Sequence, residues 1–265
     1  MSISIDLSGK SALVTASSQG MGFACAEIFV KAGANVLICA RNEDNLSSAN
    51  QRLNEIRPGS CTSVVADVSK LDDVNNVLSV ANDTFESIDI LVNNAGGPKP
   101  GKIETLSDQD WFDAINLNLM STVRFSTAVL PKMKENAWGR IINITSILAK
   151  APGAGMGLSN SLRAGVLGFA KTLSREVAEY GITVNSLCPG AVETERFNRL
   201  AELDAKEEGK TVEEVKLECK EGIPVKFIAQ PTDFANCALF FASKESAYVT
   251  GTVLQVDGGE YKGII

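Results

Sequence analysis

Short apolar segments of strand-like composition alternate with longer helical stretches along most of this chain. The segments cover residues 11–16, 36–40, 63–66, 88–93, 141–145 and 183–187. Strands that alternate with helices form right-handed βαβ units, which produce a parallel sheet covered by helices on both faces. We therefore predict one α/β domain over residues 1–265 with a doubly wound fold, whose ligands bind at the carboxyl ends of the strands.

The overall composition fits a single large domain and argues against several kinds of partner. A chain of 265 residues with 45% hydrophobic residues is long enough for a continuous core. The formal net charge of −7 disfavours nucleic acid. No segment approaches the ~20 apolar residues of a membrane span, and the amino terminus lacks the features of a signal peptide. We expect a cytoplasmic protein with no membrane partner.

The cysteines and the absence of histidine restrict the chemistry further. Six cysteines show no C-x-x-C spacing and are read as reduced packing residues. The chain contains no histidine, which excludes Ser-His and Cys-His nucleophile pairs and histidine-based zinc sites. We predict no metal site.

A glycine-containing turn separates the first predicted strand from the first predicted helix. Residues 15–22 read TASSQGMG. Glycines there allow the backbone to approach a pyrophosphate, and the amino end of the helix attracts its charge. An ordinary turn between a strand and a helix remains the alternative interpretation of this segment alone.

Four further motifs follow the other predicted strands. They are Asp67-Val68, Asn93-Asn94-Ala95-Gly96, the PGAVET segment at 189–194, and VDGG at 256–259. Together with the turn at 15–22, these motifs resemble the short-chain dehydrogenase/reductase family over essentially the whole chain. The resemblance implies a Rossmann fold with a seven-stranded parallel sheet, a nicotinamide cofactor and a small carbonyl or alcohol substrate.

The resemblance also implies which residues hold the cofactor. Gly20 and Gly22 would line the turn, and Asp67 and Val68 would meet the adenine. The segment from Pro189 to Thr194 would hold the nicotinamide end. The complete predicted set is Thr15, Ser17, Ser18, Gly20, Met21, Gly22, Arg41, Asn42, Asp67, Val68, Asn93, Ala95, Gly96, Arg163, Pro189, Gly190, Val192 and Thr194. In one departure, Ala16 stands where the family has its first glycine, which either lowers affinity or only shifts the loop.

The end of the second strand indicates which cofactor is preferred. A carboxylate there would accept hydrogen bonds from the adenosine ribose and repel a 2′-phosphate, but this chain has Ala40 followed by Arg41. NADP(H) is therefore predicted over NAD(H), with Ser17 and Asn42 as supporting donors. The alternative is that Arg41 is only a solvated surface charge.

The positions that correspond to the family's catalytic residues are only partly occupied by the expected types. Asn118 and Ser146 match the family's asparagine and serine, whereas Ser159 and Arg163 stand where the family has tyrosine and lysine. In the family the lysine lowers the pKa of the phenol that donates a proton. A serine hydroxyl is far less acidic, so a water held by Ser159 and Ser146 is the predicted proton carrier.

Other candidate donors and a second function remain open. Cys188, Lys99 and Lys150 follow predicted strands and are more simply read as packing or rim residues, and no tyrosine occupies the expected place. The chain is predicted to be an oxidoreductase that interconverts a carbonyl and an alcohol, such as a 3-oxoacyl reductase. The alternative is a protein that binds NADP(H) without turnover.

Longer segments of the sequence predict how a ligand reaches the site and how the protein assembles. Residues 195–222 are charged and long enough to form a helical flap over a ligand. The resemblance implies a homotetramer that pairs through helices at about 107–136 and 157–180 and through the carboxyl-terminal strand.

Overall fold

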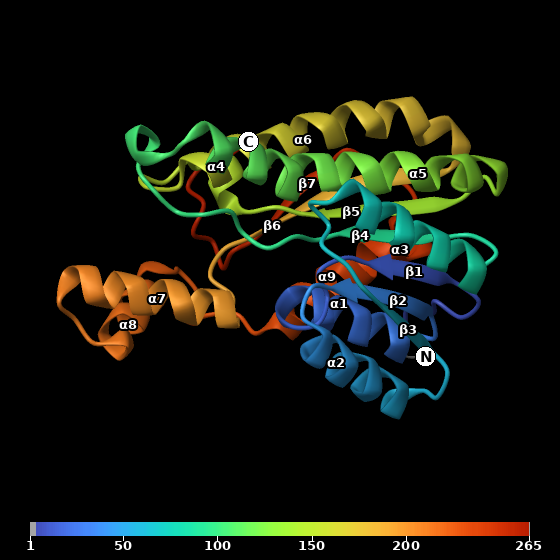
Figure 1. Ribbon diagram of the computed structural model, residues 1–265, viewed down its shortest axis with the longest axis horizontal. Coiled ribbons are helices and arrows are strands. Elements are labelled where there is room, and N and C mark those ends of the chain that lie inside the picture. Colours follow the sequence, from blue (N-terminus) through green and yellow to red (C-terminus); the bar gives the residue numbers. More distant parts are fainter. Residues whose placement is uncertain (1–3, 265) are drawn as a thin grey trace.

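A seven-stranded parallel sheet with helices on both faces forms the fold (Figure 1). The computed structural model describes residues 4–264. The strand order is β3-β2-β1-β4-β5-β6-β7, and every neighbouring pair is parallel. The strands are β1 Ser11–Val14, β2 Asn35–Ala40, β3 Cys61–Val65, β4 Ile90–Asn93, β5 Gly139–Ile144, β6 Ile182–Pro189 and β7 Val253–Val256. The doubly wound α/β fold predicted from the sequence is confirmed.

Helices follow the strands in the expected alternation, with additional short segments at the carboxyl edge of the sheet. The α-helices are α1 Gly20–Lys31, α2 Glu43–Ile56, α3 Leu71–Thr84, α4 Asp108–Ala114, α5 Ser121–Glu135, α6 Gly157–Val177, α7 Glu195–Glu208, α8 Val212–Gly222 and α9 Pro231–Ala242. A π-helical segment, Ile115–Met120, joins α4 directly to α5. The single-turn 3₁₀ helix Ile147–Ala149 follows β5.

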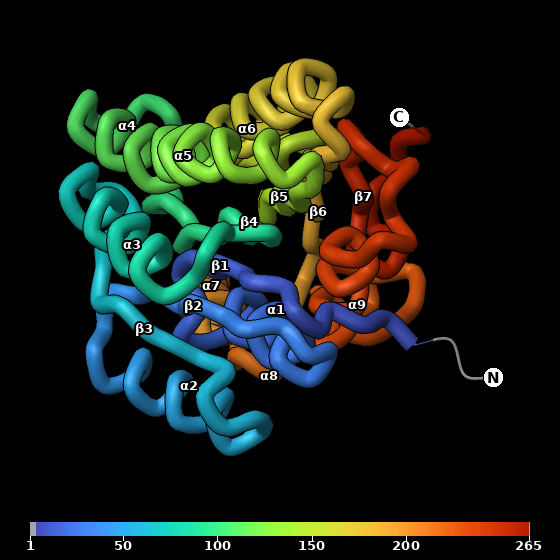
Figure 2. Tube along the Cα trace, turned by 90° about the vertical axis from the view of Figure 1, so that its right-hand side faces the viewer, coloured from blue at the N-terminus to red at the C-terminus, as the bar shows by residue number. Residues whose placement is uncertain are grey.

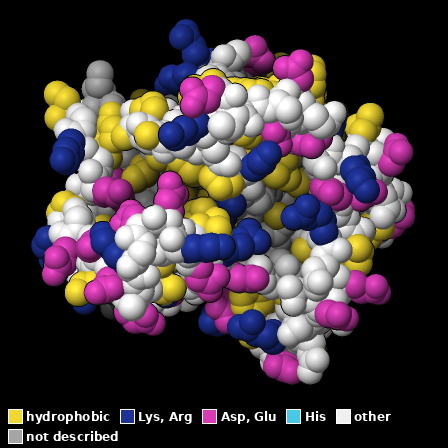
Figure 3. Space-filling model, turned by 60° about the vertical axis from the view of Figure 1, so that its left-hand side comes forward, with side chains coloured by type: hydrophobic (Ala, Val, Ile, Leu, Met, Phe, Trp, Pro, Cys, Tyr) yellow, Lys and Arg dark blue, Asp and Glu magenta, His cyan; other side chains and the backbone are white. Residues whose placement is uncertain are grey.

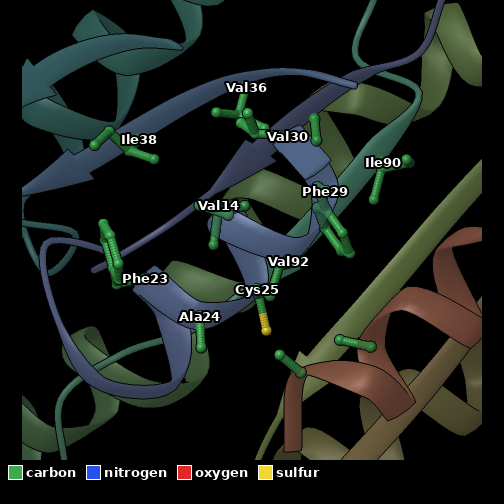
Figure 4. Packing of buried hydrophobic residues seen from close by; sticks show 14 of the residues in the cluster. Val14, Phe23, Ala24, Cys25, Phe29, Val30, Val36, Ile38, Ile90 and Val92 are labelled. Atoms are coloured by element: carbon green, nitrogen blue, oxygen red, sulfur yellow. The ribbon is translucent and has the colours of Figure 1, made fainter. Parts of the chain in front are cut away.

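Two hydrophobic clusters, one on each face of the sheet, hold the layers together. Buried side chains of α1, α2 and α9 pack on one face, while those of α3, α5 and α6 pack on the other (Figure 2). Figure 4 shows part of the first cluster, where Phe29 of α1 packs among Val14, Val36, Ile90 and Val92. Apolar residues that point to both faces of one strand explain why the sequence shows nearly continuous apolar runs.

The strand order reverses between β1 and β4, which pair through Ala12, Leu13 and Val14. In open α/β sheets, such a reversal leaves a crevice outside the carboxyl ends of the strands. The long loops that follow these strands, together with α7 and α8, lie at this edge (Figure 1). The fold therefore positions residues from many segments around one crevice.

Candidate functional site

Two adjoining cavities, here called cavity 1 and cavity 2, lie at the carboxyl edge of the sheet. Their volumes are about 290 and 300 Å³. Figure 3 shows the face that carries α7 and α8, which is hollowed and bears dark blue Lys and Arg side chains. Both cavities are lined by the same six residues at their junction: Met21, Asn94, Ala95, Gly96, Thr194 and Arg196. One elongated ligand can therefore occupy both.

Most of the residues predicted from the sequence line these cavities. Cavity 1 contains Ser18, Gly20, Met21, Arg41, Asn42, Asp67, Val68, Ala95, Gly96 and Thr194. Cavity 2 contains Met21, Ala95, Gly96, Ser146, Ser159, Arg163, Pro189, Gly190, Val192 and Thr194. The structure thus brings residues from seven loops and helices to one crevice.

The turn after β1 is built around close backbone approaches. Ala16 has a φ of 46° and Gly20 a φ of 60°, which are both in the left-handed region. A Cβ at Gly22 would lie 2.6 Å from Nδ2 of Asn94 and 2.8 Å from the carbonyl oxygen of Ala16. Asn94 Nδ2 itself donates to that oxygen at 2.9 Å. Gly22 is therefore required by packing within the turn and does not line a cavity.

The first turn of α1 contains no acidic residue of its own, and the carboxylate of Glu195 is bonded to its N-cap residue, Gln19. Gln19 makes no side-chain capping bond. Unpaired N–H groups and the helix dipole give this end partial positive charge. Ser18, Gln19, Gly20 and Met21 line cavity 1, so this positive end faces it.

Four other predicted residues support the crevice without lining either cavity. Thr15 Oγ1 donates to the carbonyl oxygen of Asn94 at 2.6 Å, and Ser17 Oγ donates to that of Val14 at 2.6 Å. Asn93 Nδ2 donates to Ser126 Oγ, and Asn118 Nδ2 donates to the carbonyl oxygen of Gly96, both at 2.9 Å. The structure does not bring Ser17 to the cavity as a phosphate donor, because its buried hydroxyl is engaged by the backbone.

Arg41 and Asp67 face each other across cavity 1. The Arg41 side chain is 71% exposed, and its Nη1 lies 4.0 Å from Asp67 Oδ2. Burial opposes ionisation of Asp67, but hydrogen bonds from Ser69 and the nearby Arg41 lower the pKa of this carboxyl overall. Asn42 caps α2 by accepting from the Asn45 amide through Oδ1. Arg41 is thus a mobile cation at the rim, held by one long ionic contact.

Ser159 and Arg163 lie one helical turn apart at the start of α6, and both are buried against cavity 2. Arg163 Nη1 donates to the carbonyl oxygen of Ile144 at 2.7 Å, and Nη2 donates to that of Ala95 at 3.4 Å. Burial, with a contribution from Arg196, lowers the pKa of Arg163 to about 10. The guanidinium therefore remains charged near neutral pH.

Ser146 and Asn118 reach the same region from different elements. Ser146 follows β5, lines cavity 2 and accepts from the Leu148 amide at 3.2 Å. Asn118 is buried in the π-helical segment, and its Oδ1 has no hydrogen-bond partner within residues 4–264. Arg163 Nε is also buried without a partner in the described chain. Unpaired buried polar atoms of this kind are often satisfied by an internal water.

The alternative proton donors considered from the sequence lie outside the two cavities. Cys188 is fully buried with its Sγ 3.0 Å from Thr145 Oγ1, and burial raises the pKa of its thiol. Lys99 forms a salt bridge with Asp110 at 3.0 Å. Lys150 lies over the ring of Tyr261, 4.9 Å from its centre. None of these side chains is among the residues that line cavity 1 or cavity 2.

Among the cavity residues that the sequence did not predict, three polar or charged ones stand out: Gln19, Glu195 and Arg196. Gln19 and Glu195 line cavity 1, and Gln19 Nε2 donates to Glu195 Oε2 at 2.5 Å. Arg196 lines both cavities and bonds the carbonyl oxygens of Gly97 and Pro98. Glu195 and Arg196 directly follow the predicted residue Thr194 at the start of the predicted flap, and this adjacency could have identified them from the sequence.

The described part of the chain carries neither an evident metal centre nor a membrane span. No group of three or more Cys, Asp or Glu side chains within residues 4–264 is placed to hold a metal ion. No helix in the same range is long and apolar enough to cross a membrane.

Comparison with known proteins places this architecture in a family. The sequence model described as "Enoyl-(Acyl carrier protein) reductase" matches residues 15–260. The 3-oxoacyl-[acyl-carrier-protein] reductase of Vibrio harveyi is 35% identical over 257 residues, which are 97% of this chain and 99% of that protein. The same reductase of Escherichia coli K12 is also 35% identical, with the same coverage.

Solved structures of reductases are also similar to this protein in backbone fold. L-sorbose reductase from Gluconobacter frateurii, solved with NADPH and L-sorbose, matches with a TM-score of 0.94 and 32% identity over 99% of this chain and all of that one. YwfH, an NADPH-dependent reductase involved in bacilysin biosynthesis, matches with a TM-score of 0.93 and 29% identity, over 97% of this chain and all of that one.

The fold and the paired cavities define an α/β protein whose crevice suits an extended ligand with a polar centre. The chain belongs to the short-chain dehydrogenase/reductase family.

Proposed function

We propose that this protein is an NADP(H)-dependent reductase that interconverts a carbonyl and an alcohol. The observation that carries the proposal is the pair of joined cavities at the carboxyl edge of the sheet, lined at one end by Arg41 and at the other by Ser146, Ser159 and Arg163. The similarity to 3-oxoacyl reductases and to NADPH-dependent reductases supports the same activity.

Cavity 1 fits the adenosine half of the cofactor. Asp67 and Val68 form the wall for the adenine, while Arg41 and Asn42 supply the donors for a 2′-phosphate. Ala40 supplies no carboxylate to repel that phosphate. The amino end of α1 provides the partial positive charge that suits the phosphates.

Cavity 2 fits the nicotinamide half and the substrate. Pro189, Gly190, Val192 and Thr194 form the wall of the nicotinamide end, and the cation of Arg163 lines the same cavity. When bound, the reduced cofactor supplies the hydride for the carbonyl carbon. The protein's own task is to position the two reactants, exclude bulk water and deliver a proton to the carbonyl oxygen.

Proton delivery has to proceed without the family's phenol. Ser146 donates a hydrogen bond to the carbonyl oxygen, and Ser159 holds a water in the space that the phenol would fill. Asn118 orients the loop through its bond to the carbonyl oxygen of Gly96. The cation of Arg163 stabilises negative charge that develops on the oxygen, because a charge in a partly buried site is poorly screened.

The wall of cavity 2 narrows the substrate to a compound with an apolar portion beside the carbonyl. The apolar lining residues are Ile144, Ile147, Leu148, Met156, Phe197 and Leu200. The apolar wall favours a 3-oxoacyl thioester, and a ketose, which carries hydroxyl groups beside its carbonyl, is the contrasting probe taken from the similar L-sorbose reductase. Helix α7 carries two of these residues, Phe197 and Leu200, and together with α8 it forms the proposed flap over the substrate.

The test is single-turnover oxidation of NADPH and of NADH by the purified chain with a panel of carbonyl compounds that includes both probes. We expect cofactor oxidation with at least one compound, and faster oxidation of NADPH than of NADH. Binding of NADPH with no oxidation across the panel would favour the alternative, a cofactor-binding protein without turnover.

The active form is proposed to be a cytoplasmic homotetramer. The α4–α5 and α6 surface carries the exposed Phe112 and small residues such as Ala164 and Gly168, while β7 is an edge strand with Leu254 partly exposed. Two separate surfaces of this kind suit the two interfaces of a symmetric tetramer. A monomeric mass in sedimentation at micromolar concentration would contradict it.

A further inference from the structure

Arg196 occupies a position that the family motifs do not assign. It lies in the first turn of α7, directly after the N-cap residue Thr194 and Glu195. Its guanidinium lines cavity 1 and cavity 2 together, and the side chain is partly buried. It is the only charged residue among the six shared by both cavity linings.

The bonds of this guanidinium leave its charge uncompensated. Nη1 and Nη2 donate to the carbonyl oxygens of Gly97 and Pro98, each at the long distance of 3.3 Å. A Cβ at Gly97 would overlap the guanidinium, so the glycine makes room for it. Arg196 forms no salt bridge within residues 4–264. The carboxylate of Glu195 is engaged by Gln19 instead.

Two other guanidiniums, those of Arg163 and Arg199, lie near Arg196, while the carboxylates of Glu195 and Glu260 line cavity 1 and cavity 2 respectively. The charge of Arg196 contributes to lowering the pKa of Arg163, so the two guanidiniums lie close enough to repel each other. Arg163 is buried, lines cavity 2 and has no carboxylate partner in the described chain. The charge of Arg199, which lies one turn further along α7, likewise contributes to lowering the pKa of Arg196. An anion at the junction would relieve this repulsion.

A dinucleotide that fills both cavities carries its own anion at the required place. Its diphosphate joins the two nucleosides, so a cofactor with one nucleoside in each cavity crosses the junction at the diphosphate. We infer that Arg196 is a diphosphate-binding residue, which clamps the cofactor from α7 opposite the amino end of α1. This inference rests on the proposed cofactor and adds a cationic ligand to the glycine-containing turn.

The test measures equilibrium binding without turnover. Dissociation constants are determined by calorimetry for NADPH, for 2′-phospho-ADP-ribose, which keeps the diphosphate, and for adenosine 2′-monophosphate, which lacks it. In Arg196→Gln we expect binding of the first two to weaken about 10- to 100-fold, because a charge-assisted hydrogen bond is lost. Binding of the third should change less than about twofold.

Two further variants separate the charge of Arg196 from its structural contacts. Arg196→Lys keeps the cation but loses the paired donation to Gly97 and Pro98, so we expect it to bind diphosphate ligands better than Arg196→Gln. Arg199→Gln removes the same charge from an exposed position of the same helix and should leave all three constants nearly unchanged. The dependence of NADPH affinity on salt should be shallower in Arg196→Gln than in the native chain.

The outcomes distinguish this inference from the proposed function. If the native chain binds neither NADPH nor NADH, both proposals are overturned. If it binds NADPH but Arg196→Gln binds it equally well, only the diphosphate role is overturned. Equal losses in the Gln and Lys variants, or an equal loss with adenosine 2′-monophosphate, would also overturn it, because the effect would then be structural.

Discussion

Nη1 of Arg163 donates a 2.7 Å hydrogen bond to the carbonyl oxygen of Ile144, the last residue of β5. The bond is buried and connects α6 to the strand that leads into Ser146. Arg163 therefore links the two elements that carry the candidate catalytic hydroxyls, in addition to placing a cation at cavity 2. Replacing Arg163 therefore changes both the position of the positive charge at cavity 2 and the contact between α6 and β5.

Arg163→Lys is expected to destabilise the fold although it conserves the charge. The single ammonium cannot reproduce the fork that bonds Ile144 and Ala95, so a buried carbonyl loses a partner at a cost of about 1–3 kcal/mol. Denaturant unfolding measures the difference. The control is Arg175→Lys on the exposed side of the same helix, and equal stability of the two variants would contradict the structural role.

The double variant Ser159→Tyr with Arg163→Lys tests whether the site is adapted or decayed. We expect it to lose any native activity while keeping cofactor affinity, because the phenol displaces the water that Ser159 holds. The single variant Ser159→Ala should lower the single-turnover rate by about 10²-fold, as expected for a positioned proton-transfer group. A gain of reductase activity in the double variant would instead indicate decay.

The matched control for Ser159→Ala is Ser161→Ala, two residues along α6 on its exposed side. It changes the same group at a position away from both cavities and should leave the rate unchanged. An unchanged rate in Ser159→Ala itself would remove the serine hydroxyl from the mechanism.

Arg41→Ala should weaken NADPH about tenfold and leave NADH nearly unaffected. The side chain is 71% exposed, which keeps the effect of its charge modest because solvent screens it. Titration of both cofactors against the native chain, Arg41→Ala and the distant surface variant Lys102→Ala measures the preference. The assignment of the 2′-phosphate site would be wrong if the native chain bound NADH more tightly than NADPH, or if Arg41→Ala kept the native preference for NADPH.

Ala16→Gly is expected to stabilise the protein. Ala16 holds a φ of 46°, which costs an alanine more than a glycine, so the exchange should gain up to about 1 kcal/mol despite the flexibility of glycine in the unfolded chain. Ala137, with a φ of 49° far from the cavities, provides the comparison. Both variants should unfold at higher denaturant concentration, and only Ala16→Gly should alter NADPH affinity.

Thiol reactivity should follow burial rather than proximity to the cavities. Burial raises the pKa of Cys25 and of Cys39 to about 12 and also raises that of Cys188. At pH 8 a thiol of pKa 12 is ionised in about one molecule in 10⁴. Iodoacetamide should therefore label Cys219 and Cys237 first in the native protein, as peptide mass analysis would show.

Cys188 can also be tested as a proton donor. Cys188→Ala should keep its single-turnover rate and its pH profile, because the protonated, buried thiol faces Thr145 instead of the cavity. A lost limb in the pH profile of this variant would reinstate the thiol as a donor.

The fold was predictable because its signals are local. Apolar runs, the N-cap Asn42 and the cluster of motifs after the strands each act within a few residues. The ends of strands differed from the prediction where pairing with a neighbouring strand sets them. β3 begins at Cys61, two residues earlier than predicted, because Cys61 pairs with Val36 of β2. β1 ends at Val14 because Ala16 turns into the left-handed region.

The candidate site was predictable only as far as the motifs extend. Residues at strand ends were found, whereas Ser17 was expected in the cavity and is buried by its bond to Val14. The contact between Gln19 and Glu195 joins residues 176 positions apart and leaves no periodic trace in the sequence. The π-helical segment that holds Asn118 was likewise not predicted, because its six residues continue the helical spacing of α4 and α5.

Cavity 2 is assembled from both extremes of the chain, since Met21 and Glu260 both line it. During synthesis the amino-terminal βαβ unit emerges first, but cavity 2 stays incomplete until the segment that contains Glu260 has been made. Until β7 pairs with it, β6 is an exposed edge that can recruit another strand. A dinucleotide that spans both cavities contacts segments from the β1 turn to the residues after β7, so its binding stabilises their assembly into one sheet.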